Sequence, residues 1–206
     1  MMALVAVFAF SAVTASGALA AKKGEIVNKE GKAPVKNKFT GKSNKAGLLE
    51  TEAGSKITCK ETGLSGTILT TKTGSATFTF TGCESGGFKC KSGSETAGTI
   101  IVKVNLAGAV VAEKDYIENT LEKETEVVCT GLKIKIKGAL LIPVSPEETL
   151  QTEYVFAATG SKGKQTPEIA ANHLEAQFVK EGSKFEKASL SATELKTTFE
   201  EAVKAI

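Results

Sequence analysis

The amino-acid sequence predicts a mainly β protein, folded as a single antiparallel sandwich or barrel-like domain that carries disulfides. Three observations support this prediction: short runs in which apolar and polar residues alternate, polar turns that separate the runs, and four cysteines. A period of two places every second side chain on the same face of a strand. Short strands spaced in this way are typical of a sandwich or barrel rather than of a βαβ fold.

The clearest strands lie in the middle of the chain. Phe78 and Phe80 alternate with threonines, the stretch 100–106 repeats the pattern with Ile, Val and Leu, and 132–137 alternates Leu or Ile with Lys. Each run therefore has one apolar face. The turns between runs are polar and contain Gly, at 72–75 and 84–87.

The stretch 124–137 predicts a β-hairpin with a specific register. A turn at Thr130-Gly131 brings complementary charges together on one face and apolar side chains together on the other, as cross-strand pairing favours. The expected partners are Cys129 with Leu132, Glu126 with Lys135, Glu124 with Lys137, and Val127 with Ile134.

The C-terminal stretch 185–206 fits two structures. Leu195, Phe199 and Val203 form a helical stripe, and Ser191 with Glu194 has the spacing of a capping box. The preceding residues alternate instead as in a strand, and the threonines here disfavour a helix. A short C-terminal helix and a strand are both left open.

The N-terminal 45 residues differ in composition from the rest. Residues 1–20 are apolar and end in Ala18-Leu19-Ala20, which indicates a signal peptide cleaved after Ala20. The segment 21–45 is rich in Lys and poor in apolar residues, so we interpret it as a basic flexible tail. It is a solvated linker or, alternatively, a contact for anionic envelope polymer. The β domain is then expected to span 46–206.

Composition excludes several kinds of site. The chain has no Arg and no Trp, one His and one Asp, so it lacks a guanidinium fork for phosphate and the residues for a His-rich metal centre. It also has no Gly-rich phosphate loop of the usual spacing and no basic-aromatic pattern for nucleic acid. We therefore predict no cofactor, no metal, no nucleic-acid partner and no membrane span in the mature chain.

The four cysteines are expected to form two disulfides, because their number is even and the chain is predicted to be exported. Four cysteines allow three pairings. We favour Cys83–Cys90, across the turn that separates them, together with Cys59–Cys129.

A few motifs could carry chemistry, but each has a simpler explanation. Ser161 and Lys164 have the spacing of a Lys-activated serine, yet they lie in a polar loop, and His173 is expected at the surface. The adjacent glutamates at 147–148 and 200–201 point to opposite faces if they lie on strands, so neither pair flanks one bond. The threonines at 77, 79 and 81 are expected to form an exposed face on one strand. No catalytic residue is assigned.

Four stretches of the chain are, in one-letter code, NKFTGKSNKAGLLETEAGSKITCKETGLSGTI, TFTFTGCESGGFKCKSGSETAGTIIV, EVVCTGLKIKIKGAL and SKGKQTPE. Together they resemble uncharacterised secreted four-cysteine β proteins that some soil actinobacteria encode in many copies. The resemblance implies export, disulfides and a β domain, and it carries no assigned activity. Thr130-Gly131 and Lys137 depart from the Gly-Gly and Arg that these proteins often have. Their strand-like ends favour a strand over 185–206.

These observations predict a secreted or cell-surface protein that binds or has a structural role without catalysis. The alternative is a secreted hydrolase whose site has no recognisable motif. An enzyme would need a concave pocket in which titratable groups converge, so a cleft that brought Glu side chains and His173 together would favour the hydrolase.

Overall fold

A computed structural model describes residues 24–179 and 184–206, and every regular element in these ranges is a strand. The described residues therefore include no helix that is long and apolar enough to cross a membrane. The strands are β1 (Ile26–Val27), β2 (Lys38–Ser43), β3 (Gly47–Thr51), β4 (Lys56–Cys59), β5 (Glu61–Ile68), β6 (Thr73–Thr81), β7 (Glu84–Ser85), β8 (Phe88–Ser92), β9 (Thr99–Val111), β10 (Lys114–Leu121), β11 (Thr125–Cys129), β12 (Leu132–Pro143), β13 (Gln151–Ser161), β14 (Lys164–Thr166), β15 (Leu174–Val179) and β16 (Glu186–Ala205).

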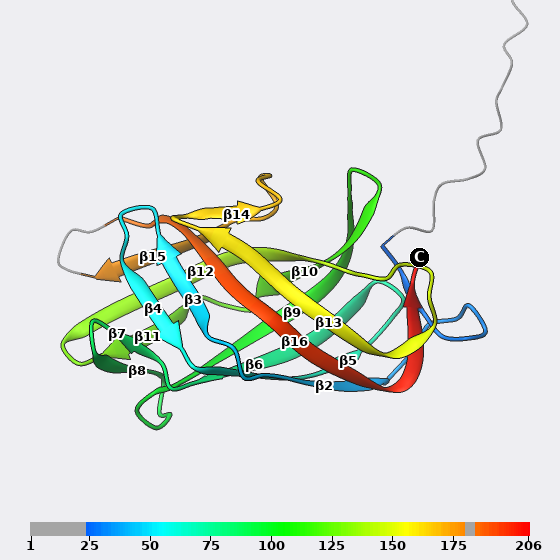
Figure 1. Cartoon of the computed structure of the whole chain (residues 1–206), viewed down its shortest axis with the longest axis horizontal. Helices are drawn as coiled ribbons and strands as arrows, with labels where there is room; N and C mark the ends of the chain where they lie inside the picture. The colour runs from blue at the N-terminus through cyan, green and yellow to red at the C-terminus, as the bar shows by residue number, and fades with distance from the viewer. Residues whose placement is uncertain (1–23, 180–183) are drawn as a thin grey trace, which may run out of the picture.

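The strands form two antiparallel arrangements that share β12 and β16. The first runs in the order β13-β16-β2-β5-β6-β9-β10-β12. The second is a closed ring, in which β3-β4-β7-β8-β11-β12-β15-β16 returns to β3. In Figure 1, β16 crosses the molecule as one long strand beside β13. The mainly β, barrel-like fold with disulfides is thus confirmed.

Both shared strands change partners along their length, and in β12 the change falls at a residue with a left-handed backbone. In β12, residues up to Gly138 pair with β15, and residues from Ala139 onward pair with β10. Gly138 has φ +115°, where a side chain would be strained. In β16, Ser191 is the last residue paired with β3, and Ala192 already pairs with Ala158 of β13; Glu194, with φ +57°, lies two residues beyond this change.

The inward faces of both arrangements meet in one hydrophobic core. An aromatic part of the core lies in the first arrangement. The ring centroids of Phe39 and Phe199 are 5.2 Å apart, and the Tyr154 ring meets the Phe199 ring edge-on, with 5.8 Å between their centroids. Burial raises the pKa of the Tyr154 phenol, so the hydroxyl stays protonated and can donate to the carbonyl oxygen of Val203 at 3.0 Å.

The segment expected to be a flexible tail contains two strands of the sheet, β1 and β2, so the β structure begins before the expected boundary at 46. β1 pairs with the end of β16, and β2 lies between β16 and β5. Two apolar residues of this basic segment are buried, since Val27 is 1% exposed and Phe39 5%, whereas Val35 is exposed. Hydrogen bonds along both edges of β2, together with this burial, offset the conformational entropy that the segment loses on folding. Composition alone did not indicate this. Residues 1–23, with the expected signal peptide, lie outside the described ranges.

The stretch 186–205 is a strand, so of the two structures left open for the C-terminal stretch the strand is the one observed. The ambiguity has a simple origin. Leu195, Phe199 and Val203 are four residues apart, and four is a multiple of two. The same three side chains therefore share one face of a helix or of a strand. Here Thr197, between the first two, is buried with them, which only a period of two explains.

The predicted hairpin register over 125–136 is confirmed. Cys129 pairs with Leu132, Val127 with Ile134, and Glu126 with Lys135. The ion pairs, however, run diagonally: Lys133 Nζ lies 3.7 Å from Glu126, and Lys135 Nζ lies 2.9 Å from Glu124. Lys137 reaches across the other edge of β12 to Glu175, at 3.0 Å. Glu124 precedes β11, so its expected pairing with Lys137 does not form.

Candidate functional site

The two disulfides join neighbouring strands of the closed ring. Cys59 bonds to Cys83, and Cys90 bonds to Cys129. The predicted pairing of Cys83 with Cys90 and of Cys59 with Cys129 is therefore wrong, although all four cysteines are bonded as expected.

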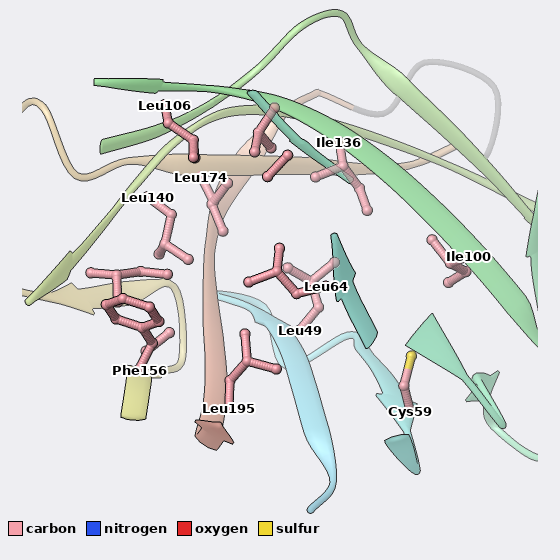
Figure 2. Close-up of a cluster of buried hydrophobic side chains, with 14 of the residues drawn as sticks. Leu49, Cys59, Leu64, Ile100, Leu106, Ile136, Leu140, Phe156, Leu174 and Leu195 are labelled. Atoms are coloured by element: carbon pink, nitrogen blue, oxygen red, sulfur yellow. The ribbon is translucent and has the colours of Figure 1, made fainter. Parts of the chain in front are cut away.

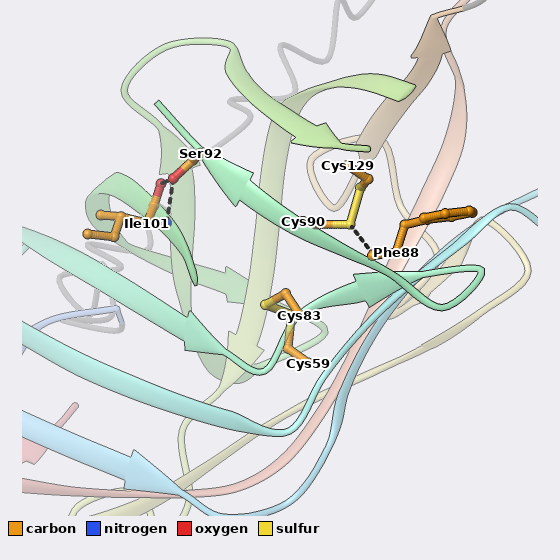
Figure 3. The surroundings of a disulfide bond; sticks show 7 residues. All are labelled: Cys59, Cys83, Phe88, Cys90, Ser92, Ile101 and Cys129. Atoms are coloured by element: carbon orange, nitrogen blue, oxygen red, sulfur yellow. Dashed lines mark hydrogen bonds between the residues drawn. A yellow bond between two sulfur atoms is a disulfide. The ribbon is translucent and has the colours of Figure 1, made fainter. Parts of the chain in front are cut away.

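Strand order explains the observed pairing. Cys90 lies directly opposite Cys129 in the β8–β11 ladder, and Thr58 lies opposite Glu84, which sets Cys59 beside Cys83. The turn over 84–89 does bring Cys83 and Cys90 together, since the Cys90 amide donates to the Cys83 carbonyl at 2.9 Å. Each sulfur nevertheless bonds to the cysteine of the strand on its outer side, β4 or β11 (Figure 3).

An apolar cavity of about 110 Å³ lies where the two arrangements face each other. Strands of both contribute inward side chains, and Figure 2 draws several of them, among them Leu49, Leu140 and Leu195. Its walls are aliphatic and aromatic, and the charged residues of the same strands alternate outward. The lining residues are Ser43, Gly47, Leu49, Ile57, Cys59, Thr62, Phe78, Phe80, Ile100, Val102, Asn119, Leu121, Ile136, Leu140, Ile142, Phe156, Ala157, Ala158, Leu174, Leu190, Ala192 and Leu195.

Three of these lining residues carry hydrogen-bonding side chains, and they differ in how they are satisfied. The Asn119 amide donates to the carbonyl oxygens of Ile117, at 2.9 Å, and of Leu140, at 3.3 Å. The Ser43 hydroxyl accepts from the Lys45 amide at 3.2 Å. The Thr62 hydroxyl is buried and has no hydrogen-bond partner among the described residues.

Of the residues singled out from the sequence, Cys59 lines this cavity, and the residues considered for catalysis do not line it and lie apart from one another. Ser161 and Lys164 are exposed and pair across the tight turn between β13 and β14, so they form a hairpin end. His173 is exposed and precedes β15. The threonines at 77, 79 and 81 lie on β6, inside the sheet between β5 and β9, and are half-buried rather than exposed.

The glutamate pairs are also separated. Glu147 and Glu148 lie in the connection between β12 and β13, where a Glu147 carboxylate oxygen accepts from the Asp115 amide at 3.0 Å. Glu200 and Glu201 lie on β16. The described residues contain no group of three or more His, Cys, Asp or Glu side chains that could hold a metal ion.

Glu50 is a buried carboxylate that sequence reasoning missed. It lies on β3 with 6% exposure, accepts a hydrogen bond from the Lys162 amide at 2.9 Å and faces Lys56 Nζ at 3.1 Å. The hydrogen bond from Lys162 and then the contact with Lys56 hold its pKa below the ordinary value of 4.5. This contact ties the β13–β14 turn to the closed ring. No local sequence pattern predicts the contact between Glu50 and Lys162, because the two residues are distant in the chain.

The lowered pKa predicts how stability depends on pH. The unfolded chain takes up a proton at Glu50 more readily than the folded chain does, so the stabilisation is present above 4.5 and is lost as pH falls through the lower folded pKa. Urea unfolding between about pH 6 and about pH 3 measures this loss. Glu50→Gln should remove this part of the acid sensitivity. Glu61→Gln, at an exposed salt bridge, is the matched control and should retain it.

Comparison of the chain with protein-family models, with curated proteins and with solved structures gives no match. The fold and the cavity therefore define the class: an all-strand, disulfide-linked protein with an apolar interior cavity.

Proposed function

We propose that this chain is a secreted or cell-surface protein that acts by binding and not by catalysis. The observation that carries the proposal is the chemistry of the cavity, whose lining, among the residues that the structure describes, includes no Asp, Glu, His, Lys or Tyr side chain. General acid–base or nucleophilic chemistry needs such groups within reach of the substrate. The two disulfides support an oxidising compartment, as does the signal-like segment 1–20.

The alternative, a secreted hydrolase, would require Glu and His173 side chains to converge in a cleft. His173 and the two glutamate pairs instead lie on three different parts of the fold, and none of them lines the cavity. Binding is therefore the function that the arrangement supports better.

The exposed lysines of the N-terminal segment offer a surface for an anionic envelope polymer. Lys32, Lys36 and Lys38 are exposed, and none of them forms a salt bridge to a described residue. Exposed ammonium groups attract a polyanion, and salt screens the attraction. The resemblance to secreted four-cysteine proteins is consistent with this location.

The test uses the mature chain recovered from culture supernatant, which should begin at Ala21 by mass spectrometry. We expect it to be retained on purified cell walls, to be released by salt, and to liberate no hydrolysis product from wall glycan or ester substrates. Replacing Lys32, Lys36 and Lys38 with Gln should weaken retention several-fold. The same replacement at the exposed Lys103, Lys114 and Lys123, with an equal change in charge, is the control. Turnover proportional to protein concentration would support the hydrolase instead.

A further inference from the structure

We propose that the interior cavity binds a small neutral molecule with an apolar body and one hydrogen-bonding group, which the Thr62 hydroxyl holds. This inference rests on the proposed binding function and names the chemistry of its ligand.

Thr62 is the polar anchor because its position leaves it buried and unsatisfied. It lies on β5, where its backbone pairs with Ser43 of β2 and Phe80 of β6. Thr62 is 3% exposed, and its Oγ1 has no hydrogen-bond partner among the described residues. A buried hydroxyl without a partner is costly and rare in folded proteins. A ligand with a hydroxyl or carbonyl group would satisfy it.

The other polar lining groups are already used within the protein. The Asn119 amide donates to two main-chain carbonyls, and the Ser43 hydroxyl accepts from the Lys45 amide. A ligand with several polar groups would therefore leave most of them unpaired in an apolar space, which disfavours its binding. The cavity selects for a single polar group, placed at the β5 wall.

The walls and volume restrict the rest of the ligand. None of the described lining side chains carries a charge, so an ionised ligand would be buried among them without a counterion. The volume of about 110 Å³ approaches that of an apolar cavity of roughly 150 Å³ that holds benzene. A second void of about 30 Å³ shares Phe78, Ile142 and Leu195 with the first, so small side-chain shifts can extend the space. The fitting ligand has roughly six to eight non-hydrogen atoms.

The seam between β12 and β13 provides a route to the cavity. Both strands contribute lining residues, yet no ladder joins them. The free edge of β12 is covered instead by the segment before β15: the Leu141 amide donates to Asn172 Oδ1 at 2.8 Å, and the Ala139 amide donates to the His173 carbonyl at 2.7 Å. Opening this short segment breaks few hydrogen bonds, so the seam is a low-cost route into the cavity.

Phenol, toluene and benzoate are suitable probes, because the first two have nearly the same shape and the third adds a charge. The disulfide-intact mature chain is titrated with each, and methyl chemical shifts of the cavity residues and calorimetry report binding. We expect phenol and toluene to bind saturably with shifts confined to the cavity, and benzoate to show no binding.

Thr62→Val tests the anchor, because it replaces the hydroxyl with a methyl group of similar size. It should weaken phenol binding about tenfold and leave toluene binding unchanged or slightly stronger. Equal effects on both probes, or no effect on phenol, would overturn the role of Thr62.

Gly47→Ala tests the location. A methyl group there would lie 3.8 Å from Thr62 Oγ1 and meet no atom more closely, so the variant should fold normally while it occupies part of the cavity. It should weaken both probes by at least several-fold. If it leaves both affinities unchanged, or if Thr62 holds a long-lived water and no probe binds, the proposal fails. Neither result changes the cell-wall retention experiment, so failure here is distinguishable from failure of the proposed function.

Discussion

Replacing Cys90 and Cys129 together with Ala should lower the free energy of unfolding by about 4 kcal/mol, in the chain-entropy account of disulfides. This bond joins residues 39 apart, whereas Cys59 and Cys83 are 24 apart. The longer loop restricts the unfolded chain more, so the loss of Cys59–Cys83 should cost slightly less, about 3.5 kcal/mol. The two loops do not overlap in sequence, so the two effects should be nearly additive.

Urea unfolding of the two double variants measures these losses, with the parent chain as reference. The single variants Cys59→Ala and Cys83→Ala should resemble each other, because both break the same bond. Non-reducing peptide mapping supplies the independent check. A peptide that joined Cys83 to Cys90 would contradict the observed disulfide pairing, and so would a large difference between those two single variants.

The sequence predicted well what depends on neighbours in the chain. The alternation over 132–137 and the turn at Thr130-Gly131 are local, and they fix which residues of the β11–β12 hairpin face each other. Such a local pattern is enough to predict both the two strands and the register in which they pair. The strand class was predictable for the same reason, because a period of two needs only a few consecutive residues to be recognised.

The cysteine pairing could not be predicted, because it depends on strands that are distant in sequence. β8 lies between β7 and β11, and β4 pairs with β7; no local pattern encodes either neighbour. The turn between Cys83 and Cys90 suggested the nearer partner, but two cysteines adjacent across a hairpin can each bond outward. Backbone proximity alone therefore did not choose the bond.

The cavity and the N-terminal strands were missed for a related reason. Lining residues such as Leu140 and Phe156 have the pattern of ordinary core positions, and nothing in the sequence separates a side chain that fills space from one that borders it. Likewise, the basic segment 24–45 looked too polar to order, yet two apolar side chains and pairing along both edges of β2 hold it. Composition averages over a segment, whereas burial depends on individual positions.

Gly138 should be among the least replaceable residues of the chain, because β12 changes sheets there. Its φ of +115° strains any other residue, and an added Cβ would collide with the His173 carbonyl carbon and oxygen. That carbonyl accepts the Ala139 amide, so the collision also displaces the start of β15. We expect Gly138→Ala to lower the free energy of unfolding by at least about 3 kcal/mol, since backbone strain and steric overlap add.

Gly131→Ala is the matched control for this effect. Gly131 also has a left-handed backbone, with φ +75°, but a Cβ there meets nothing within 4 Å. It should therefore lose only the conformational term, about 1 kcal/mol. Urea unfolding of both variants separates strain from collision. Equal losses would contradict a role for the close approach of β15 to β12 at Gly138. The left-handed backbone of Gly138 would then be enough to explain why glycine is needed there.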